Sequence, residues 1–362
     1  MSSKKSLSIF SLRSYPLFNP DSKDIIGGAE VQLYLIAKQF SKSKLFEQIN
    51  FFVGDYNQKY IEFDNKIKLV RCINGKNKLF INFLRIIYHF YTTKSDYYLF
   101  RAYNIYVVVL ILFLKITKKK VIFMVPHDSY TDNNYHKNLL IKRINNLIYH
   151  FSNKIIVQNE YQRNALYKRG FSSRIIKSGY KLNEKKINKK DFVLWVGRSE
   201  KWKRPDVFLN LAKKNSSLKF IMICQESKDK DYYLKIEKKA HKIKNLEFIS
   251  FVPFNKIDKY FKNAKIFINT STQEGFPNTY IQAMKNKTPI LALNVNPNNI
   301  INQHNLGLCA NNSLYKLNKY LNLLYSDNHS YNYYSKNVFN YVEKNHDIKK
   351  ISLELYEEIV ND

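Results

Sequence analysis

The amino-acid sequence predicts a mixed α/β protein of two domains, each built around a parallel sheet, and three observations support this prediction. Short apolar runs rich in β-branched and aromatic residues alternate with segments of helical spacing along the chain, which is typical of parallel α/β sheets. At 362 residues the chain suits two domains of roughly 180 residues better than one. A polar, lysine-rich stretch at 181–190 separates two series of strand-like runs and is predicted to be a linker.

The positions of the strand-like runs define the expected domains. The first domain is expected to span 1–180 and the second 191–340, while 341–362 is expected to hold a C-terminal helix that packs back on the first domain. Within that last segment an amphipathic pattern extends from Ile348 to Val360. The strand-like runs are Leu7–Leu12, Ile49–Val53, Ile67–Cys72, Tyr97–Phe100, Val121–Val125 and Lys154–Val157 in the first domain, and Phe192–Gly197, Leu218–Cys224, Leu246–Phe251, Ala264–Asn269 and Pro289–Leu293 in the second.

The chain is strongly basic, with 60 Lys and Arg against 29 Asp and Glu and a formal net charge of +31. Such a charge steers a protein towards nucleic acid, anionic membranes or acidic substrates, and a solvated basic face is the alternative. The lysines are spread along the whole chain without a recognition motif of the nucleic-acid-binding modules, so no nucleic-acid partner is expected.

The cysteines bear on metal binding and on the redox compartment. Cys72, Cys224 and Cys309 lie far apart, each at the end of a strand-like run, and they are predicted to be small core residues in a reducing cytosol. Because no His/Cys cluster accompanies them, no metal is expected.

Apolar segments bear on membrane association. The apolar run at the N-terminus stops by Leu12 and lacks the hydrophobic core of a signal peptide. The longest apolar run, Ile105–Leu114, is about half a membrane span, so no transmembrane helix is predicted and a cytoplasmic location is expected. The segment Lys78–Tyr91 is apolar with basic edges. It leaves two interpretations open, a helix buried in the first domain or a peripheral contact with an anionic membrane surface.

The most informative segment is Thr270–Met284, which follows the strand-like run ending at Asn269. It places a carboxylate, Glu274, after the strand and then opens a helix. Gly275 and Pro277 let the backbone turn sharply there, into a helix whose unpaired N–H groups attract anions. Because ligands of open α/β sheets bind at the carboxyl ends of strands, a nucleoside diphosphate is the expected ligand. The alternative is that Glu274 only stabilises the helix N-terminus through its charge.

Two candidates follow strands of the first domain. Gly27 and Gly28 come after the first strand and before a helical pattern, and paired glycines either let a backbone approach a ligand closely or simply make a turn. His127, with Asp128 beside it, follows the strand Val121–Val125. A lone histidine is usually structural, but a His-Asp pair at the carboxyl edge of a strand is a reasonable site group.

Basic residues follow the first strand of the second domain. The turn from Gly197 through Arg198 to Lys203 and Arg204 carries several cations just past that strand. Fixed cations there can bind a diphosphate and stabilise the negative charge that grows on it as it leaves. A solvated basic loop is the alternative.

These motifs together resemble the group 1, family 4 retaining glycosyltransferases. The residues that carry the resemblance are Gly-Gly-Ala-Glu at 27–30, His127, Val-Gly-Arg at 196–198 with Lys203, and the run from Glu-Gly-Phe-Pro-Asn-Thr-Tyr to Gln-Ala-Met at 274–284. The resemblance covers nearly the whole chain. It implies the GT-B fold, in which two Rossmann-like domains face each other across a cleft, with the acceptor on the first domain and the nucleotide-sugar donor on the second.

The resemblance also implies roles for the matching residues. His127 would lie beside the transferred sugar, Arg198 and Lys203 would hold the diphosphate, and Glu274 would contact the donor sugar. Gly28 would approach the donor phosphate or the acceptor, and backbone N–H groups of 276–279 other than that of proline would meet the phosphates. The implied catalytic residues are Glu274, His127, Arg198 and Lys203, and the implied donor-binding residues are Gly27, Gly28, Gly197, Arg198, Lys203, Glu274, Gly275, Phe276, Pro277, Asn278, Thr279 and Gln282.

One position departs from the family pattern. The family has paired carboxylates seven residues apart, and here the second position is Gln282. That residue commonly bonds the ribose hydroxyls in the family, and an amide can still accept and donate such bonds without charge. Catalysis is therefore expected to survive, while the sequence leaves donor affinity and nucleotide choice open.

The expected function is retaining transfer of a sugar from a nucleotide-diphosphate sugar to a hydroxyl of a glycan or lipid-linked acceptor, in surface-polysaccharide assembly. No cofactor and no metal are expected. Two alternatives stay open: a GT-B sugar-nucleotide epimerase or phosphorylase, because fold does not determine function, and a catalytically silent basic module that binds glycan or nucleic acid. The donor sugar, the nucleotide base, the acceptor and the oligomeric state are not determined by the sequence.

Overall fold

The computed structural model describes residues 5–19, 21, 22, 24, 26–59, 61–73, 79–131, 139–182 and 190–361. The chain divides into two compact units: unit 1 comprises Met1–Gly179 and Ile348–Asp362, and unit 2 comprises Tyr180–Asp347. The first unit is thus closed by the C-terminal residues. Most of the predicted linker, residues 183–189, lies outside the described residues.

Unit 1 contains an eight-stranded sheet in the order β3-β4-β2-β1-β5-β6-β7-β8. Its strands pair in parallel except for β3, which lies antiparallel on β4 at the edge. Each predicted strand of this half has a counterpart, and the structure adds β3 and β8, which are short and only partly buried. The strands are β1 (Ser6–Phe10), β2 (Gln48–Gly54), β3 (Ile61–Asp64), β4 (Ile67–Ile73), β5 (Tyr97–Phe100), β6 (Lys120–Met124), β7 (Lys154–Val157) and β8 (Arg174–Ile175).

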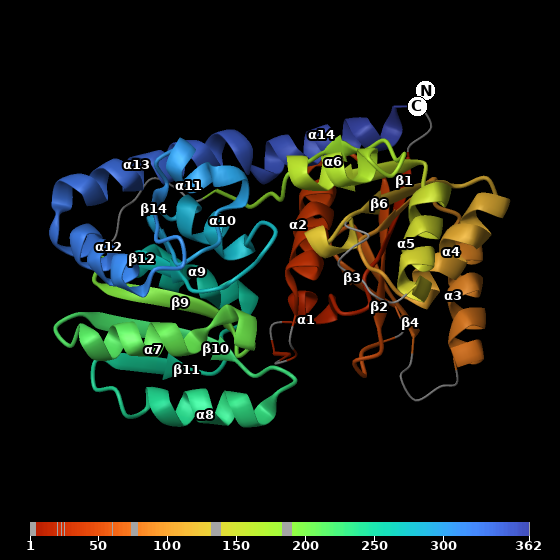
Figure 1. Ribbon diagram of the computed structural model, residues 1–362. Coiled ribbons are helices and arrows are strands. Elements are labelled where there is room, and N and C mark those ends of the chain that lie inside the picture. Colours follow the sequence, from red (N-terminus) through yellow and green to blue (C-terminus); the bar gives the residue numbers. More distant parts are fainter. Residues whose placement is uncertain are drawn as a thin grey trace. The chain divides into compact units, whose positions relative to one another are not determined.

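Helices cover both faces of the unit 1 sheet (Figure 1). One core cluster joins β1 and β2 to the buried sides of α2 and α14, and a second joins the opposite face to α3, α4 and α5. The helices are α1 (Tyr15–Phe18), α2 (Gly28–Ser43), α3 (Leu79–Thr93), α4 (Ile105–Ile116), η1 (Asp128–Tyr130), α5 (Leu139–Phe151), α6 (Glu160–Tyr167) and α14 (Ile348–Val360). The terminal helix spans Ile348–Val360, as the amphipathic pattern predicted, while residues 341–345 still belong to α13 of unit 2.

Unit 2 contains a six-stranded, fully parallel sheet in the order β11-β10-β9-β12-β13-β14. Its strands are nearly continuous apolar runs, as expected of strands buried on both faces. The strands are β9 (Phe192–Arg198), β10 (Lys219–Gln225), β11 (Leu246–Ile249), β12 (Ala264–Asn269), β13 (Ile290–Ala292) and β14 (Gly307–Cys309); the helices are η2 (Lys201–Lys203), α7 (Pro205–Lys214), α8 (Lys230–Ala240), α9 (Phe254–Asn263), α10 (Asn278–Lys285), η3 (Pro297–Asn299), α11 (Ile300–Gln303), α12 (Leu314–Ser326) and α13 (Asn328–Asn345).

Both sheets have a point at which the direction of chain progression reverses. In unit 1 the chain goes outward from β1 through β2 and β4, and then restarts on the other side of β1 with β5. In unit 2 it goes from β9 through β10 to β11, and restarts beside β9 with β12. The crevice outside the carboxyl ends of the strands at such a switch point is where open α/β sheets bind ligands. The fold class predicted from the sequence is therefore confirmed, with one switch point in each unit.

Several local predictions are tested by burial. Cys72, Cys224 and Cys309 are free and buried, which confirms their assignment to the core.

Among the described residues, no helix combines the length and apolar character needed to cross a membrane. The segment Lys78–Tyr91 forms most of α3, with Lys78 itself outside the described residues. The interpretation of this helix as buried is wrong for one of its sides, where Phe80 and Tyr88 are exposed.

Candidate functional site

The switch point of unit 2 brings two of the predicted motifs together. β9 and β12 are neighbours in the sheet, and they end at Arg198 and Asn269. The segments that follow these strands therefore emerge side by side at the carboxyl edge. They carry Lys203 on η2 and Glu274 in the loop before α10.

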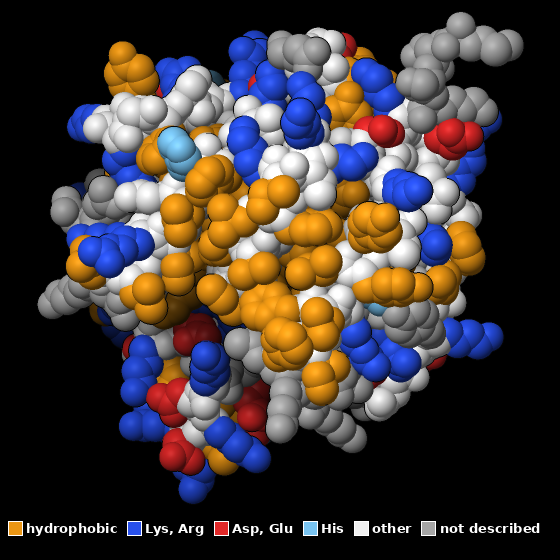
Figure 2. Space-filling view, turned by 90° about the vertical axis from the view of Figure 1, so that its right-hand side faces the viewer, with side chains coloured by type: hydrophobic (Ala, Val, Ile, Leu, Met, Phe, Trp, Pro, Cys, Tyr) orange, Lys and Arg blue, Asp and Glu red, His pale blue; other side chains and the backbone are white. Residues whose placement is uncertain are grey.

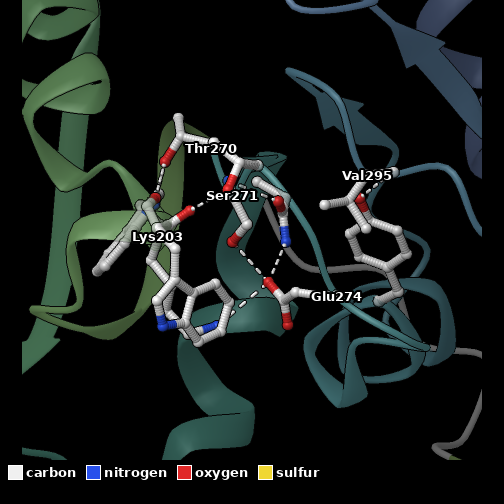
Figure 3. Close-up of polar contacts among 10 residues, drawn as sticks. Lys203, Thr270, Ser271, Glu274 and Val295 are labelled. Atoms are coloured by element: carbon white, nitrogen blue, oxygen red, sulfur yellow. Dashed lines mark hydrogen bonds and ion pairs between the residues drawn. The ribbon is translucent and has the colours of Figure 1, made fainter. Parts of the chain in front are cut away.

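Glu274 is held by three donors that converge on one of its carboxylate oxygens. Oε1 accepts hydrogen bonds from Lys203 Nζ at 3.1 Å, from Asn269 Nδ2 at 3.1 Å and from Ser271 Oγ at 2.6 Å. Figure 3 shows Lys203 and Ser271 pointing towards Glu274 from two different segments. No described residue bonds to Oε2, so one oxygen is fixed and the other is left for a ligand.

The ion pair between Lys203 and Glu274 is well shielded from solvent, because each side chain is only 15% exposed. Its ammonium group also lies 4.3 Å from the centroid of the Trp202 ring, where the face of an aromatic ring attracts a cation. A pair in such a place requires good geometry to offset the loss of hydration. The additional bonds from Asn269 and Ser271 supply that geometry.

A second set of bonds joins the two segments through their backbones. Thr270 Oγ1 donates to the Lys203 carbonyl at 2.7 Å and accepts from Trp195 Nε1 at 2.9 Å. The Thr272 N–H donates to the Trp202 carbonyl at 2.8 Å. The position of Lys203 relative to Glu274 is therefore determined by several contacts and does not depend on the ion pair alone.

Gly197 leaves the space through which the Lys203 side chain passes. A Cβ at this position would lie 2.8 Å from Trp195 Cη2 and 3.3 Å from Lys203 Cδ. Trp195 is buried in the core of unit 2 and cannot move aside. A glycine is thus required here by close packing.

The loop from Gly275 to Pro277 leads into α10, which begins at Asn278 with Pro277 as its N-cap. The first amides of a helix have no intrahelical acceptor, and the helix dipole adds a partial positive charge at that end. Tyr280 anchors the helix, because it is fully buried and its OH donates to the Val295 carbonyl at 2.7 Å (Figure 3). Burial, together with the charge of Glu274, raises the pKa of Tyr280 well above its ordinary value, so the OH stays a donor.

The other predicted residues of unit 2 lie around this point. Arg198 is the last residue of β9 and is partly exposed, and no described residue forms a hydrogen bond or ion pair with its guanidinium group. The ring of Phe276 contacts that of His346, close to the end of unit 2, with centroids 4.9 Å apart and the rings tilted by 41°. Gln282 lies one turn into α10 and is only 7% exposed. Thr279 is partly exposed in the first turn of the same helix.

In unit 1, His127 follows β6 and caps the short helix η1. Its Nδ1 accepts a hydrogen bond from the Ser129 N–H at 3.2 Å. In the neutral ring the proton therefore lies on Nε2, which no described residue contacts through a hydrogen bond. His127 can donate that N–H to a ligand.

Asp128 does not form the pair with His127 that the sequence suggested. Its Oδ1 accepts from Asn159 Nδ2 at 3.1 Å and from Gln162 Nε2 at 2.7 Å, so the carboxylate faces α6. Gln158 Nε2 also donates to the Val125 carbonyl at 3.0 Å. These amide groups fix the loop that carries His127, and Asp128 positions the loop without touching the imidazole.

Gly27 and Gly28 lie at the beginning of α2, with Gly27 as the N-cap in an extended conformation. A Cβ at Gly27 would lie 2.6 Å from a carboxylate oxygen of Glu30. The side chain of Glu30 is therefore folded back over the N-terminus of α2, where its charge is favourable.

Asn269, Ser271 and Trp202 are the residues of the unit 2 site that the sequence interpretation missed. A polar Asn-Thr-Ser run at the end of an otherwise apolar strand was the available signal for the first two. Trp202 had no such signal, because its contact with the Lys203 ammonium depends on the turn of η2. Among the described residues, His, Cys, Asp and Glu do not gather in groups of three or more that would hold a metal ion.

Comparisons with known proteins show what the two units are similar to. Residues 180–341 match the family model described as Glycosyl transferases group 1. No curated protein matches the sequence at a significant level. Among solved structures, a sucrose-phosphate synthase from Thermosynechococcus elongatus is 14% identical with a TM-score of 0.78, and the alignment covers 98% of each chain.

Two further solved structures are similar over nearly their whole length. S. aureus TarM, in a complex that contains UDP, is 14% identical with a TM-score of 0.71 over 99% of this chain and 100% of that one. WaaG, a glycosyltransferase involved in lipopolysaccharide biosynthesis, is 14% identical with a TM-score of 0.68 over 98% of this chain and 100% of that one. At such identities the likeness establishes the fold, which is GT-B. Residues 180–341 thus match the group 1 glycosyltransferases, and the fold of the chain is GT-B.

Proposed function

We propose that the protein is a retaining, family 4 type glycosyltransferase that moves a sugar from a nucleotide-diphosphate sugar to a hydroxyl of a glycan or lipid-linked acceptor. The observation that carries the proposal is the arrangement of Glu274, which keeps Oε2 open while Oε1 is tied to Lys203, Asn269 and Ser271. A fixed carboxylate beside a fixed cation at a switch point suits a ligand with sugar hydroxyls and a diphosphate.

Different residues of unit 2 are proposed to bind different parts of the donor. Lys203 has one proton directed to Glu274 and two more that can meet phosphate oxygens. Arg198, whose guanidinium has no described partner, is proposed to hold the same diphosphate, and the N-terminus of α10 is proposed to receive its charge. Glu274 Oε2 accepts a hydrogen bond from a hydroxyl of the donor sugar.

The proposed reaction keeps the configuration of the transferred sugar. The acceptor hydroxyl attacks on the face from which the diphosphate departs, the bond from the anomeric carbon to the phosphate oxygen breaks, and a bond to the acceptor oxygen forms. The acceptor proton passes to the leaving phosphate, so the products are a glycoside and a nucleoside diphosphate. His127 Nε2–H is proposed to donate to the sugar from unit 1. Cations placed where charge develops lower the barrier.

The similar proteins and the charge of the chain support a proposal for the setting. A similar structure is bound to UDP and another takes part in lipopolysaccharide biosynthesis. We propose a role in the assembly of a capsule, exopolysaccharide or lipopolysaccharide, in the cytoplasm at the inner face of the membrane, with no cofactor besides the donor.

A thermal-shift panel tests the donor site. Purified protein is heated with UDP-, GDP- and ADP-sugars, and with CMP-sugars, which carry a single phosphate. We expect one diphosphate sugar to raise the Tm of the protein, and Glu274→Ala and Lys203→Ala to abolish that shift. Lys201→Ala is the matched control, because Lys201 is two residues away but 75% exposed and paired with Asp229.

Turnover tests separate the alternatives. Retention is tested by NMR of the product anomer, and an inverted anomer contradicts the proposed mechanism. Release of free nucleotide without any acceptor indicates an epimerase, and the absence of a shift with every nucleotide sugar indicates a silent binding module. A covalent glycosyl adduct trapped on Glu274 contradicts the direct attack of the acceptor.

A further inference from the structure

Unit 1 exposes an unusual number of large apolar side chains on α3 and α5. On α3 these include Phe80, Leu84, Tyr88 and Tyr91, which are 70%, 54%, 63% and 66% exposed. On α5 they include Leu140 and Leu147, which are 64% and 41% exposed. We call the face formed by these six side chains, together with α4 between the two helices, the α3–α5 surface.

The spacing of these residues shows that α3 is apolar on its outer as well as its inner side. Residues 80, 84, 88 and 91 recur at intervals of three or four and therefore share one face of the helix. The opposite face packs on the sheet through Ile86 and Phe90, which are buried. A helix on the surface of a soluble protein normally presents polar residues on its outer face. The exposure of α3 is therefore not explained by packing within unit 1.

The surface is continuous across the helices. The rings of Phe83 on α3 and Tyr106 on α4 are in contact, with centroids 4.9 Å apart, and α4 packs on α5 in turn. Figure 2 shows this side of the protein, where hydrophobic side chains form a broad, connected area with Lys and Arg around it. A broad contiguous apolar area on the surface of a protein marks a site of interaction.

The charges on these helices are of one sign. The ranges of α3, α4 and α5 contain Arg85, Lys115, Lys142 and Arg143, and no Asp or Glu. At the edge of the surface, Leu147 also borders a hollow of about 460 Å³ that is lined by His150 and Lys168 among others. These helices thus combine large apolar side chains with cations and carry no acidic residue. Such a surface complements a partner that has an apolar interior and an anionic surface.

We propose that the α3–α5 surface docks on an anionic lipid bilayer. Phe80, Leu84, Tyr88 and Leu140 enter the region of the acyl chains nearest the headgroups, while Arg85 and Arg143 meet lipid phosphates. Aromatic side chains such as Tyr88 and Tyr91 are favoured at that depth. The partner is the membrane of the proposed function, where a lipid-linked acceptor lies, but docking itself requires no transfer activity.

A second copy of the chain fits this surface less well. A two-fold interface pairs a surface with itself, so Arg85, Lys142 and Arg143 of both copies would face one another without any carboxylate from these helices. Like charges brought together at an interface cost free energy. A bilayer supplies the negative charge that a second copy lacks.

Vesicle sedimentation tests the proposal with the full-length protein. One set of vesicles contains phosphatidylcholine alone and the other contains phosphatidylcholine with phosphatidylglycerol, and the pelleted fraction of protein gives the partition constant. We expect wild-type protein to pellet with the anionic vesicles. Leu84→Glu with Tyr88→Glu should lower the partition constant at least about tenfold, because apolar insertion is replaced by charge of the wrong sign. Leu234→Glu is the matched control, because Leu234 is 48% exposed on α8 of unit 2.

A second pair of variants separates this surface from the general basicity of a chain of charge +31. Arg85→Gln with Arg143→Gln removes two charges from the surface, and we expect about a fivefold loss of binding for each. Lys213→Gln with Lys214→Gln removes two exposed charges from α7 of unit 2 and should change binding little. Both pairs of substitutions change exposed side chains and leave the core intact. Their binding to vesicles can therefore be measured even if the double glutamate variant does not fold.

The proposal is overturned if wild-type protein stays in the supernatant with anionic vesicles, or if wild type and the Leu84/Tyr88 variant bind equally well. Equal losses of binding in the two pairs of charge variants would also overturn it. So would a dimer, seen by light scattering, that Leu84→Glu with Tyr88→Glu dissociates. The last result assigns the surface to a second copy. The thermal shift with a nucleotide sugar should be unchanged in the surface variants, so a failure of docking is distinguishable from a failure of the donor site.

Discussion

The carboxyl edges of the two sheets are built differently although both belong to parallel sheets with a switch point. The edge in unit 2 is charged, with Glu274 and Lys203 paired at 15% exposure. The edge in unit 1 carries the His127 imidazole on a loop that uncharged amides hold through Asp128. The difference shows that the same architecture can hold either a fixed charge, which suits an anion, or a fixed loop, which can orient a hydrogen-bond donor.

Loss of the Lys203 charge is expected to have the largest effect. Lys203→Ala removes the cation proposed to meet the diphosphate and leaves Glu274 without its ion pair. We expect kcat/KM to fall about 10²- to 10³-fold, measured by release of nucleoside diphosphate. Lys201→Ala should keep kcat/KM within about twofold, because it removes only an exposed charge. Equal losses in the two variants would contradict a local role for Lys203.

Two of the predicted glycines, one in each unit, provide a test of packing. Gly197→Ala brings a Cβ within 2.8 Å of the buried Trp195 ring, and we expect a loss of about 1–3 kcal/mol in the free energy of unfolding. Gly27→Ala in unit 1 meets the end of the flexible Glu30 side chain, which can rotate away, so the loss should stay below about 1 kcal/mol. Urea unfolding of both variants measures the difference, and a larger loss at Gly27 would refute it.

Asp128 tests whether the unit 1 loop depends on charge or on hydrogen bonding. Asp128→Ala removes the acceptor of Asn159 and Gln162, and we expect it to cost about 1.5–3 kcal/mol of loop stability and to lower kcat with it. Asp128→Asn keeps an oxygen that can accept both bonds and should preserve most of kcat. If the asparagine variant were as impaired as the alanine variant, the charge itself would be required and the contrast with unit 2 would disappear.

The opposite edge of the unit 2 sheet holds a second enclosed lysine, with uncharged partners. Lys190 Nζ donates to the Ala264 and Asn286 carbonyls and to Thr288 Oγ1, at 3.1, 2.8 and 2.8 Å. Burial, with the charge of Lys287 nearby, lowers the pKa of Lys190 from 10.5 to about 7. From pH 7 to 10.5 the unfolded chain therefore binds a proton that the folded protein does not.

The free energy of unfolding should consequently rise with pH in that window, by up to about 1.4 kcal/mol per pH unit from this group. Urea unfolding at pH 7, 8 and 9 measures the slope. Lys190→Met should reduce the slope, whereas Lys214→Met, on the exposed end of α7, should leave it unchanged. If Lys190→Met did not alter the dependence of the free energy of unfolding on pH, the three acceptors would have to keep the Lys190 ammonium group charged.

Gln282 is expected to have the smallest effect. Its proposed bond to the ribose is uncharged, so Gln282→Leu should raise the Kd of the nucleotide sugar only about threefold to tenfold. Isothermal calorimetry measures this change, and Gln282→Glu should keep the affinity of the wild type or improve it. An unchanged Kd in the leucine variant would remove Gln282 from the donor site.

Much of this architecture could be predicted because local sequence patterns indicate it. The strand-like runs such as Phe192–Gly197 are recognisable as β-branched apolar runs between turns, and the parallel arrangement follows from their alternation with helices. Strand ends mark the binding edge, which is why Glu274, Lys203 and His127 could be selected as candidates. Burial of Asn269 and Ser271 against Glu274 was missed, because both residues are equally compatible with an exposed turn.

Other features depended on segments that are distant in the sequence. α14 was recognisable as an amphipathic helix, but its burial through Leu355 and Ile359 required the partner surface of β1 and α2. α3 had the same kind of pattern, yet its outer side is exposed because no element among the described residues of unit 1 covers it. Periodicity identifies an apolar face but does not specify what will cover it.

The sequence by itself determined the alternation of strands and helices, the two-domain organisation and the polar residues at strand ends. Only the tertiary structure decided that β9 and β12 are neighbours, and therefore that Lys203 and Glu274, 71 residues apart, form an ion pair. It likewise turned Asp128 towards α6 and away from His127. The physical reason is that local preferences act over a few residues, whereas strand order depends on which buried surfaces fit together across the whole sheet.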